Sequence, residues 1–491
     1  MVKKFPLVGL GLFVLVLLAS CATQIEEEGV DDDAIVERLE VIEEPIEAET
    51  EGPDFLAELS DLIDVFTYLN TNHMFENDNE VLVSAAIDAM IRATDDPWIN
   101  FYSRQAHQQW ETFLSSGRTH GIGVLVEEVN GYYIIIDVIS NTPAEHEGLL
   151  LGDAILSVNG ESDFLSMAFL LSEENDHVRL LEIQRGDTIF NMEISSESYY
   201  GWLVDGITID FENQQIGYIR INAFVPGIGT TTGGTARKFI RTLDELEAEG
   251  IDGLIIDIRN NSGGVSGQVE AIVNALIPSG RPMLHMVSVD GQEWQGYTGN
   301  RLEDYRFNGN MVVLINENSF SASEIFASVM LESGNAELIG TTTGGKGTSQ
   351  EGLRVGDNIL NLSTWEFFSP LGNKVEGHGV TPTIYVETPD FYDFSPVHLG
   401  ANVVLTYDMV DERIASAQLI LDVLGFNVAR TDGYFDATTV LALESFQQAQ
   451  GLTETGTLNS ETATALSLRL REKIQDPVYD TQLNRALAWF E

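Results

Sequence analysis

The chain has 491 residues, more than one ordinary hydrophobic core accommodates, and this length predicts about three domains. Hydrophobic residues make up 44% of the sequence and aromatic residues 9%, so the composition excludes a largely disordered protein. The 77 acidic and 25 basic residues give a formal net charge of −52, which excludes nucleic acid as a partner and predicts repulsion from anionic lipid.

The N-terminus has the features of an export signal. Lys3 and Lys4 precede the apolar stretch LVGLGLFVLVLLAS, which is too short for a comfortable transmembrane span. Cys21 is the only cysteine in the sequence and ends LASC, which resembles a bacterial lipobox. We therefore expect residues 1–21 to be a lipoprotein signal peptide with lipidation at Cys21; an ordinary signal peptide is the alternative.

The next two segments predict a linker followed by helices. Residues 22–54 are acidic and punctuated by proline, which is typical of a solvated tether between a membrane and a folded body. Within residues 55–116, FLAELSDLIDVFTYL and VLVSAAIDAMIRAT space their apolar residues at helical intervals, and DDPWINFYS predicts a turn. We interpret the overall acidity as a solvated coat, with recognition of a basic partner as the alternative.

Two folded regions follow, and together they predict an α/β multidomain protein. Residues 117–198 predict a β-rich module, with strand-like runs in GIGVLVEEV, YYIIIDVI, AILSVNG and LLEIQRG and a helix-and-turn connection in TPAEHEGLLLGD. Residues 199–400 predict an α/β core with a largely parallel sheet. IGYIRI, LIIDIR and MVVLIN predict buried strands, and TARKFIRTLDELEAEG, QVEAIVNALI and SEIFASVMLES predict helices.

The remaining segments complete the predicted organisation. NILNLSTWEFFSP and TIYVE predict strands that close the parallel sheet. Residues 401–475 predict a small helical bundle built from SAQLILDVLGF, ATTVLALESFQQAQGL and SETATALSLRLR, and residues 476–491 form a C-terminal tail.

The glycine-rich run GTTTGGKGTSQ carries Lys346 and admits two interpretations. A phosphate-binding loop requires a hydroxyl residue after the lysine, but Gly347 stands there and no helix pattern follows. A desolvated lysine amine instead loses affinity for its proton and can act as a base near neutral pH. We expect Lys346 to be a general base, with no nucleotide, metal or other cofactor involved.

A serine that such a base could activate occurs in ENSFSASEIFASVM. Ser321 is expected at the corner between the MVVLIN strand and the following helix, where the Ala322 amide can help to hold an oxyanion. The plainer alternative is that Ser321 or Ser323 only caps the helix, and both roles coexist if Ser323 is the cap. A Ser–His hydrolase has less support, because His378 is expected to be a turn residue.

Gly263 and Gly264 follow the strand in LIIDIRNNSGG. Glycines at a strand end let backbone amides approach a ligand closely, which suits the second half of an oxyanion hole. A plain tight turn is the alternative.

These residues together resemble the carboxyl-terminal processing, or tail-specific, proteases, which are serine peptidases with a Ser–Lys dyad. The resemblance covers residues 55–387. DDPWINFYS is similar to the family's D-D-P-y-s element, DIRNNSGG to D-[LIV]-R-x-N-P-G-G, GGKGTSQ to G-K-G-x-x-Q, and GHGVTPTIYV to the closing G-x-G-[IV]-x-P-D-x-x-V. SFSASEIFA resembles S-A-S-A-S-E-I, with Phe320 in place of the usual alanine.

The resemblance assigns roles to particular residues. It implies Ser321 as nucleophile, Lys346 as general base and Gln350 as the residue that orients the lysine. The Ala322 amide and one of Gly263 and Gly264 would donate to the oxyanion. Glu324 and Thr343 match supporting positions of the family. Glu332 stands where some members carry an important aspartate, so its role stays open. The resemblance also implies a homodimer formed through the N-terminal helices.

Two accessory modules also resemble known families. Residues 117–198 resemble PDZ domains, which add a free peptide C-terminus as a strand and hold its carboxylate with amides, here near Gly121, Ile122 and Gly123. Residues 401–475 resemble a peptidoglycan-binding module. The plainer alternatives are a β module that only packs on the core and a helical appendage for dimer contacts.

The sequence thus predicts a membrane-anchored, extracytoplasmic serine endopeptidase of the cell envelope. Its expected partners are proteins with accessible C-terminal tails, peptidoglycan, and a membrane through the lipid anchor. The alternative of a different class is a catalytically inactive PDZ-based scaffold tethered to the wall.

Overall fold

The computed structural model describes most of the chain after the predicted linker, over residues 59–74, 78–103, 118–139, 141–163, 167, 170–171, 177–200, 203–226, 234–299, 307, 309–333, 336–356 and 358–491. The predicted signal peptide, Cys21 and the acidic linker lie outside these residues. Within the described part of the chain, every helix is too short or too polar to cross a membrane.

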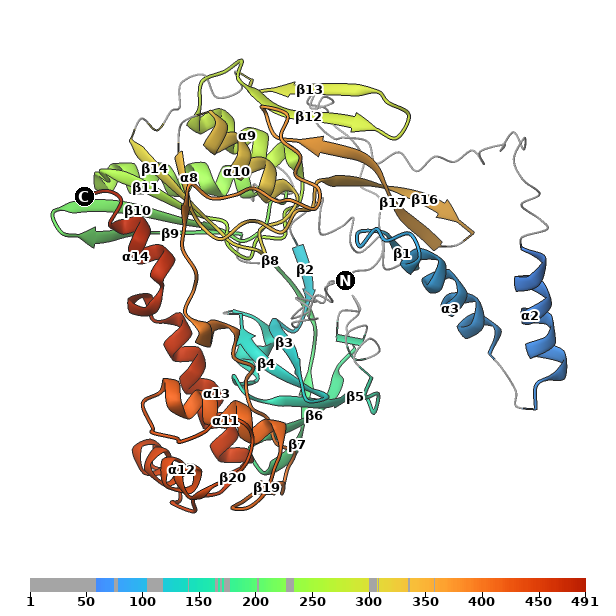
Figure 1. Cartoon of the computed structure of the whole chain (residues 1–491), viewed down its shortest axis with the longest axis vertical. Coiled ribbons are helices and arrows are strands. Elements are labelled where there is room, and N and C mark those ends of the chain that lie inside the picture. The colour runs from blue at the N-terminus through green and yellow to red at the C-terminus, as the bar shows by residue number, and fades with distance from the viewer. Residues whose placement is uncertain are drawn as a thin grey trace.

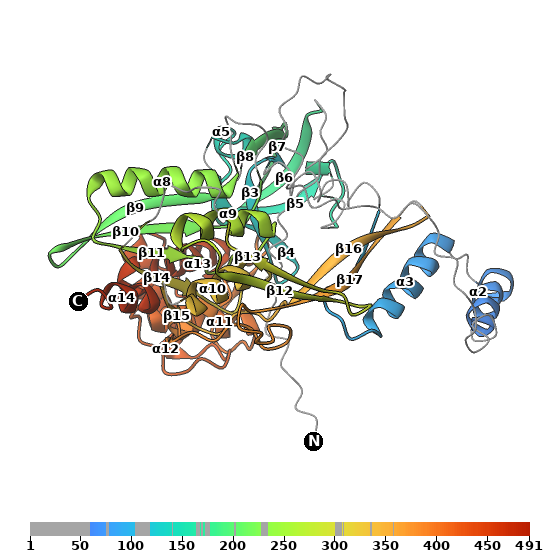
Figure 2. The ribbon, with the colours of Figure 1, turned by 90° about the horizontal axis from the view of Figure 1, so that it is seen from above.

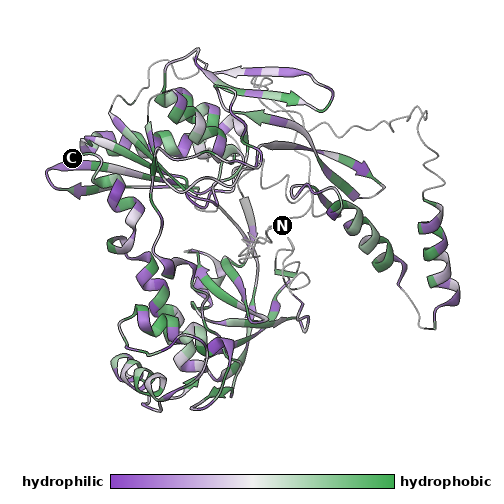
Figure 3. Ribbon diagram, in the orientation of Figure 1, coloured by the Kyte–Doolittle hydropathy of each residue, from purple (hydrophilic) through white to green (hydrophobic). Residues whose placement is uncertain are grey.

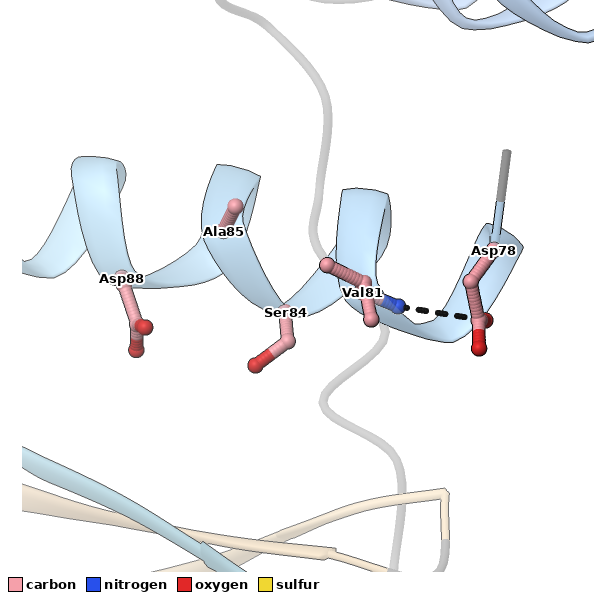
Figure 4. Close-up of a pocket in the computed structure, with 5 residues that line it drawn as sticks. All are labelled: Asp78, Val81, Ser84, Ala85 and Asp88. Carbon is pink, nitrogen blue, oxygen red and sulfur yellow. Dashed lines mark hydrogen bonds between the residues drawn. The ribbon is translucent and has the colours of Figure 1, made fainter. Parts of the chain in front are cut away.

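Two helices, α2 (Ser60–Asn72) and α3 (Asn79–Arg92), extend away from the body of the molecule, as Figures 1 and 2 show. Asp78, just before α3, lies along one face with Val81, Ser84, Ala85 and Asp88 of the helix, and the Val81 amide is directed at the Asp78 carboxylate (Figure 4). The structure therefore has helices where the apolar spacing predicts them.

The segment after α3 was expected to be a turn only. It ends instead in the strand β1 (Asn100–Ser103), which pairs antiparallel with β17 (Asn358–Phe368). The prediction was wrong for these last residues because their strand pairing depends on a segment more than 250 positions away in the sequence.

The central sheet confirms the predicted α/β core. Its six strands lie in the order β18, β15, β14, β11, β10, β9, and all neighbours are parallel except the edge strand β9. Their bounds are β9 (Val204–Phe211), β10 (Gln214–Ile221), β11 (Gly253–Asp257), β14 (Asn310–Ile315), β15 (Ala336–Gly340) and β18 (Ile384–Tyr385). The helices α8 (Thr235–Glu249), α9 (Ser266–Leu276) and α10 (Ala322–Glu332) cover one face (Figure 1).

The NILNLSTWEFFSP stretch forms β17, but the prediction that it closes the parallel sheet was wrong. It lies in a second sheet with β1, β12 (Pro282–Ser288), β13 (Glu293–Tyr297) and β16 (Thr348–Val355). Only two residues separate β16 from β17, so the two strands pair as an antiparallel hairpin, whereas a parallel neighbour would need a long crossover. TIYVE does join the central sheet, as β18.

The β-rich module is an antiparallel sheet in the order β3, β4, β5, β6, β7. Its strands are β3 (Val124–Val129), β4 (Tyr132–Val138), β5 (Ala154–Val158), β6 (Arg179–Arg185) and β7 (Thr188–Ile194), with the short helix α5 (Pro143–His146) between β4 and β5. A separate pair, β2 (Arg118–Gly121) with β8 (Glu197–Tyr200), lies at the two ends of the module.

The C-terminal bundle contains α11 (Glu412–Val423), α12 (Ala437–Gln450) and α13 (Ser460–Gln475), with a short pair of strands, β19 (Val404–Leu405) and β20 (Leu458–Asn459). Asp411, Asp436 and Asn459 cap the three helices by accepting hydrogen bonds from first-turn amides. The bundle therefore has its own core and its own helix-start signals in the sequence.

The β-rich module and the C-terminal bundle share a buried contact. Gln184 on β6 is 1% exposed and donates to the Leu399 carbonyl at 2.8 Å and to Ser460 Oγ at 3.1 Å. Arg471 on α13 lies 3.7 Å from the Asp137 carboxylate on β4. If the two modules separated, the buried side-chain amide of Gln184 would lose these partners, which is costly. The bonds therefore hold the modules together.

The predicted C-terminal tail forms a structured layer. Its helix α14 (Thr481–Leu487) places Leu483 and Leu487 in a cluster with Ile255 and Leu314, on the face of the central sheet opposite α8, α9 and α10 (Figure 1). Neighbouring residues of a strand point to opposite faces, so β14 supplies both apolar clusters. The tail thus covers a face that would otherwise be exposed.

This packing makes a stability prediction. Leu487→Ala should lower the free energy of unfolding by about 2–3 kcal/mol, because it leaves a cavity between α14 and the sheet. Val478→Ala, on the same tail but 74% exposed, should change it by no more than about 0.5 kcal/mol. Urea unfolding followed by circular dichroism measures both. Equal effects of the two variants would contradict the described packing.

Candidate active site

Ser321 lies at the corner between β14 and α10, where the sequence predicts it. It is the N-cap of α10, and its φ of 54° and ψ of −115° are a backbone conformation that residues with a side chain rarely adopt. The Ser321 amide donates to Glu324 Oε2 at 2.9 Å, which holds the strained corner in place. The side chain of Ser321 is half-buried at the start of the helix.

Of the two serines considered as caps of this helix, the structure has Ser321 and not Ser323 at the N-cap. Ser321 occupies the capping position, and Ser323 is fully buried in the first turn, where its Oγ donates to the Asn261 carbonyl at 2.8 Å. Ser319 is also buried and donates to the Ile258 carbonyl at 2.8 Å. Both serines therefore hold the corner against the loop that follows β11.

The Glu324 carboxylate joins the two segments that carry Ser321 and Lys346. Its Oε2 accepts from the Ser321 amide at 2.9 Å and from the Lys346 amide at 2.8 Å. Its Oε1 accepts from the Gly345 amide at 2.7 Å and from Thr343 Oγ1 at 2.6 Å. Because one oxygen serves both amides, the backbones of Ser321 and Lys346 lie within two hydrogen-bond lengths of each other.

Glu324 and Thr343, which the family resemblance assigns to supporting positions, thus both lie beside Ser321 and Lys346. Burial raises the pKa of Glu324, and the hydrogen bonds from Thr343 and the three amides act in the opposite direction. Thr343 Oγ1 also accepts from the Val380 amide at 2.6 Å, which extends the network to the segment before β18.

The amine of Lys346 lies 5.1 Å from the centroid of the Trp98 ring. Burial lowers the pKa of Lys346 below its ordinary value. The carboxylates of Asp96, Glu376 and Glu324 act in the opposite direction but do not cancel the effect of burial. Within the ranges that the structure describes, no hydrogen bond joins Lys346 Nζ to Ser321 Oγ. The two residues are held together at the backbone while the amine points to the indole.

Gln350 lies on β16, and the pairing of β16 with β17 shifts register between Ser349 and Gln350. Its side-chain nitrogen Nε2 donates to Thr348 Oγ1 at 2.9 Å and to Ser363 Oγ at 3.2 Å. No hydrogen bond to Lys346 is present in the described part of the chain, and the orienting role of Gln350 stays a prediction.

Gly263 and Gly264 lie against the Ser321 corner. Their φ values are 103° and 134°, and a Cβ on Gly263 would come within 2.9 Å of the Ala322 nitrogen and of Ser321 Cβ. The Gly263 amide donates to Asn261 Oδ1 at 2.8 Å. Among the described residues, the amides of Ala322 and Gly264 have no hydrogen-bond partner, so these two are available to a ligand.

Gly121, Ile122 and Gly123 connect β2 to β3. Ile122 is 2% exposed, and a Cβ on Gly123, whose φ is 87°, would meet Thr142 at 2.2 Å, so the loop packs tightly against the start of α5. β3 is an edge strand of its sheet, and in the described structure β4 is its one strand neighbour. A free edge beside a glycine loop has the geometry that strand addition requires.

Sequence reasoning missed two neighbours of Lys346. Trp98 Nε1 donates to Glu376 Oε1 at 3.3 Å, and Glu376 Oε2 accepts from the Gly347 amide at 2.7 Å. DDPWINFYS was the one signal for Trp98, and the sequence offered none for Glu376. Glu332 lies at the other end of α10, where its carboxylate accepts from the Leu371 amide at 2.7 Å and fixes that turn.

Comparison with known proteins shows which families the sequence matches. Residues 215–386 match the model of peptidase family S41, and residues 410–466 match that of a peptidoglycan binding domain. The carboxy-terminal processing protease CtpB of Bacillus subtilis (strain 168) is 30% identical over 435 residues, which cover 86% of this chain and 87% of CtpB. CtpA of the same strain is 27% identical, with 86% and 88% covered. Among solved structures, the photosystem II D1 C-terminal processing protease is 20% identical with a TM-score of 0.42, covering 67% of this chain and 87% of that one.

The hydrogen bonds to Glu324 predict a loss of stability when its carboxylate is changed. Glu324→Gln should lower the free energy of unfolding by about 3 kcal/mol, because an amide nitrogen would face backbone donors that lose their acceptor. Thermal and urea unfolding measure this loss. Glu317→Gln, at an exposed carboxylate that binds only Thr341 Oγ1 in the described structure, is the control and should be nearly neutral. Wild-type stability of Glu324→Gln would refute the role given to this carboxylate.

Proposed function

The chain belongs to the carboxy-terminal processing proteases and is a serine endopeptidase, and we propose that it acts in the cell envelope on proteins with exposed, apolar C-terminal tails. Ser321 is the nucleophile and Lys346 the general base in this proposal. The observation that carries it is the Glu324 oxygen that binds the amides of both residues, because it holds a strained serine corner and a half-buried lysine in one site. Membership of the family does not favour the inactive-scaffold alternative.

The proposed reaction is acyl transfer without a cofactor. Ser321 Oγ attacks the carbonyl carbon of the scissile peptide as its proton passes to the neutral amine of Lys346. The amides of Ala322 and Gly264 donate to the oxyanion that forms. The ammonium then protonates the leaving amine as the C–N bond breaks, and water hydrolyses the ester by the same steps in reverse. Lys346 must leave the Trp98 ring to take part.

Substrate capture is assigned to the β-rich module, which we interpret as a PDZ domain. A peptide C-terminus would pair with the free edge of β3, and its carboxylate would meet amides near Gly121, Ile122 and Gly123. The edge position of β3 and the tight glycine loop support this assignment.

Two segments support the proposed location in the envelope. The lipobox-like LASC segment supports a lipid anchor at Cys21, with residues 22–54 as a tether. The match of residues 410–466 supports binding to peptidoglycan. Exposed apolar side chains on α2 and α3, among them Ile63 and Tyr68, support the family's dimerisation mode.

The catalytic assignment predicts the effect of two substitutions. Ser321→Ala and Lys346→Ala should each lower kcat/KM for an unfolded substrate with an apolar C-terminal tail by at least about 10³-fold, because each removes a reacting group. Cleavage is followed by mass spectrometry of the products. Ser445→Ala and Lys374→Ala, at exposed positions, are the matched controls and should retain full activity. Parent-like cleavage by either active-site variant would refute the dyad.

The wall-binding assignment makes a separate prediction. The chain carrying Ser321→Ala should co-sediment with purified peptidoglycan sacculi, and soluble wall fragments should release it. Release is expected because the bundle would bind the same saccharide or peptide in the sacculi and in the fragments. Its acidic surface gives no electrostatic reason for adsorption to anionic polymer. A protein that stays in the supernatant would rule out peptidoglycan as the partner of residues 410–466.

A further inference from the structure

The aromatic ring beside Lys346 is fixed by several contacts. The Trp98 amide donates to Asp96 Oδ1 at 2.9 Å, and the indole nitrogen donates to Glu376 Oε1 at 3.3 Å. The ring also packs edge-on against Phe320, with 5.7 Å between centroids. Phe320 is the residue just before Ser321. The indole is therefore held in a set position beside Lys346 and against the residue that precedes Ser321.

Glu376 connects this ring to the loop that carries the lysine. Its Oε1 accepts from Trp98, and its Oε2 accepts from the Gly347 amide at 2.7 Å. A Cβ on Gly347 would come within 2.2 Å of the Glu376 nitrogen, so the two backbones touch. The Gly377 amide also donates to the Gly345 carbonyl at 2.9 Å. One carboxylate thus positions both the ring and the backbone next to Lys346.

The ring and the carboxylates around Lys346 favour its charged form, against burial, which lowers its pKa. The face of an indole attracts an ammonium and not a neutral amine. The carboxylates that face Lys346 are those of Asp96, Glu376 and Glu324, and each of them also favours the ammonium. A general base must be neutral when it accepts a proton. Burial lowers the pKa of Lys346, and the ring and carboxylates oppose that effect, so these contacts retain the form that cannot act as a base up to a higher pH than burial alone would.

We propose that Trp98 and Glu376 are positioning residues that hold the Lys346 ammonium away from Ser321 and thereby set the pH at which the peptidase becomes active. The inference rests on the proposed role of Lys346 as general base. Deprotonation releases the amine from the indole, and the side chain is then free to rotate to the serine. Activity therefore rises with pH as the fraction of neutral Lys346 rises.

The test compares pH profiles of Glu376→Gln and Trp98→Leu with that of the parent. Loss of the carboxylate or of the aromatic face removes stabilisation of the ammonium, so the pKa of Lys346 falls and the acid limb of the profile moves to lower pH. The expected displacement is about 0.5–1 pH unit for each variant. The readout is the rate at which a fluorophosphonate labels Ser321 in the full chain. It is measured between about pH 5 and about pH 10.

Two comparisons separate positioning from simple packing. Trp98→Tyr keeps an aromatic face and a hydroxyl donor and should restore most of the parent profile, whereas Glu351→Gln removes an exposed carboxylate from β16 and should leave the limb in place. The double variant of Trp98→Leu and Glu376→Gln should move the limb by less than the two single shifts together, because Glu376 acts partly through the ring.

Each outcome decides the inference. If Trp98→Leu fails to fold, the isosteric Glu376→Gln decides it alone. An acid limb that stays in place or moves to higher pH in Glu376→Gln overturns the holding role, even if stability falls. A parent chain whose Ser321 is not labelled, while Ser321→Ala behaves the same, removes the proposed dyad itself and this inference with it.

Discussion

The arrangement of the site depends on one buried carboxylate. Glu324 lies in the first turn of α10 and accepts hydrogen bonds from the amides of Ser321, Gly345 and Lys346 and from the hydroxyl of Thr343. A buried charge is costly unless its hydrogen-bonding capacity is used, and here four donors and a helix N-terminus surround it. The same bonds that stabilise the carboxylate fix the serine corner and the lysine loop, so one side chain holds both segments of the site in place.

The sheet beneath this site is supported from both faces. The helices α8, α9 and α10 cover one face and α14 covers the other, and the hydropathy colouring of Figure 3 shows the apolar strands between them. The tail also reaches the loop after β11, because Arg259 lies 2.7 Å from Asp257 and 2.8 Å from Asp480. This ion pair links the C-terminal layer to the segment that leads to Gly263 and Gly264. The end of the chain therefore supports the oxyanion segment as well as the sheet.

Much of this structure could be predicted from the sequence, and the failures have physical causes. MVVLI and LII are continuous apolar runs, as expected for a parallel strand that is buried on both faces. The Ser321 corner follows from the strand and helix that flank it. β17 was assigned to the wrong sheet because its hairpin with β16 was overlooked, although the two-residue Gly-Asp loop at 356–357 is a hairpin signal in the sequence. Trp98 and Glu376 meet Lys346 only through tertiary contacts between segments about 250 and 30 residues away, which residue patterns do not encode.

The most direct measurement of the central claim is a crystal structure of the chain with a peptide boronate bound to Ser321, since the tetrahedral adduct reproduces the geometry of the oxyanion. The account predicts that Lys346 Nζ leaves the Trp98 ring and lies within hydrogen-bond distance of Ser321 Oγ. It also predicts that a boronate oxygen accepts from the amides of Ala322 and Gly264, and that Glu324 keeps its four bonds. An adduct in which Lys346 remains over the indole and another group contacts Ser321 Oγ would contradict it.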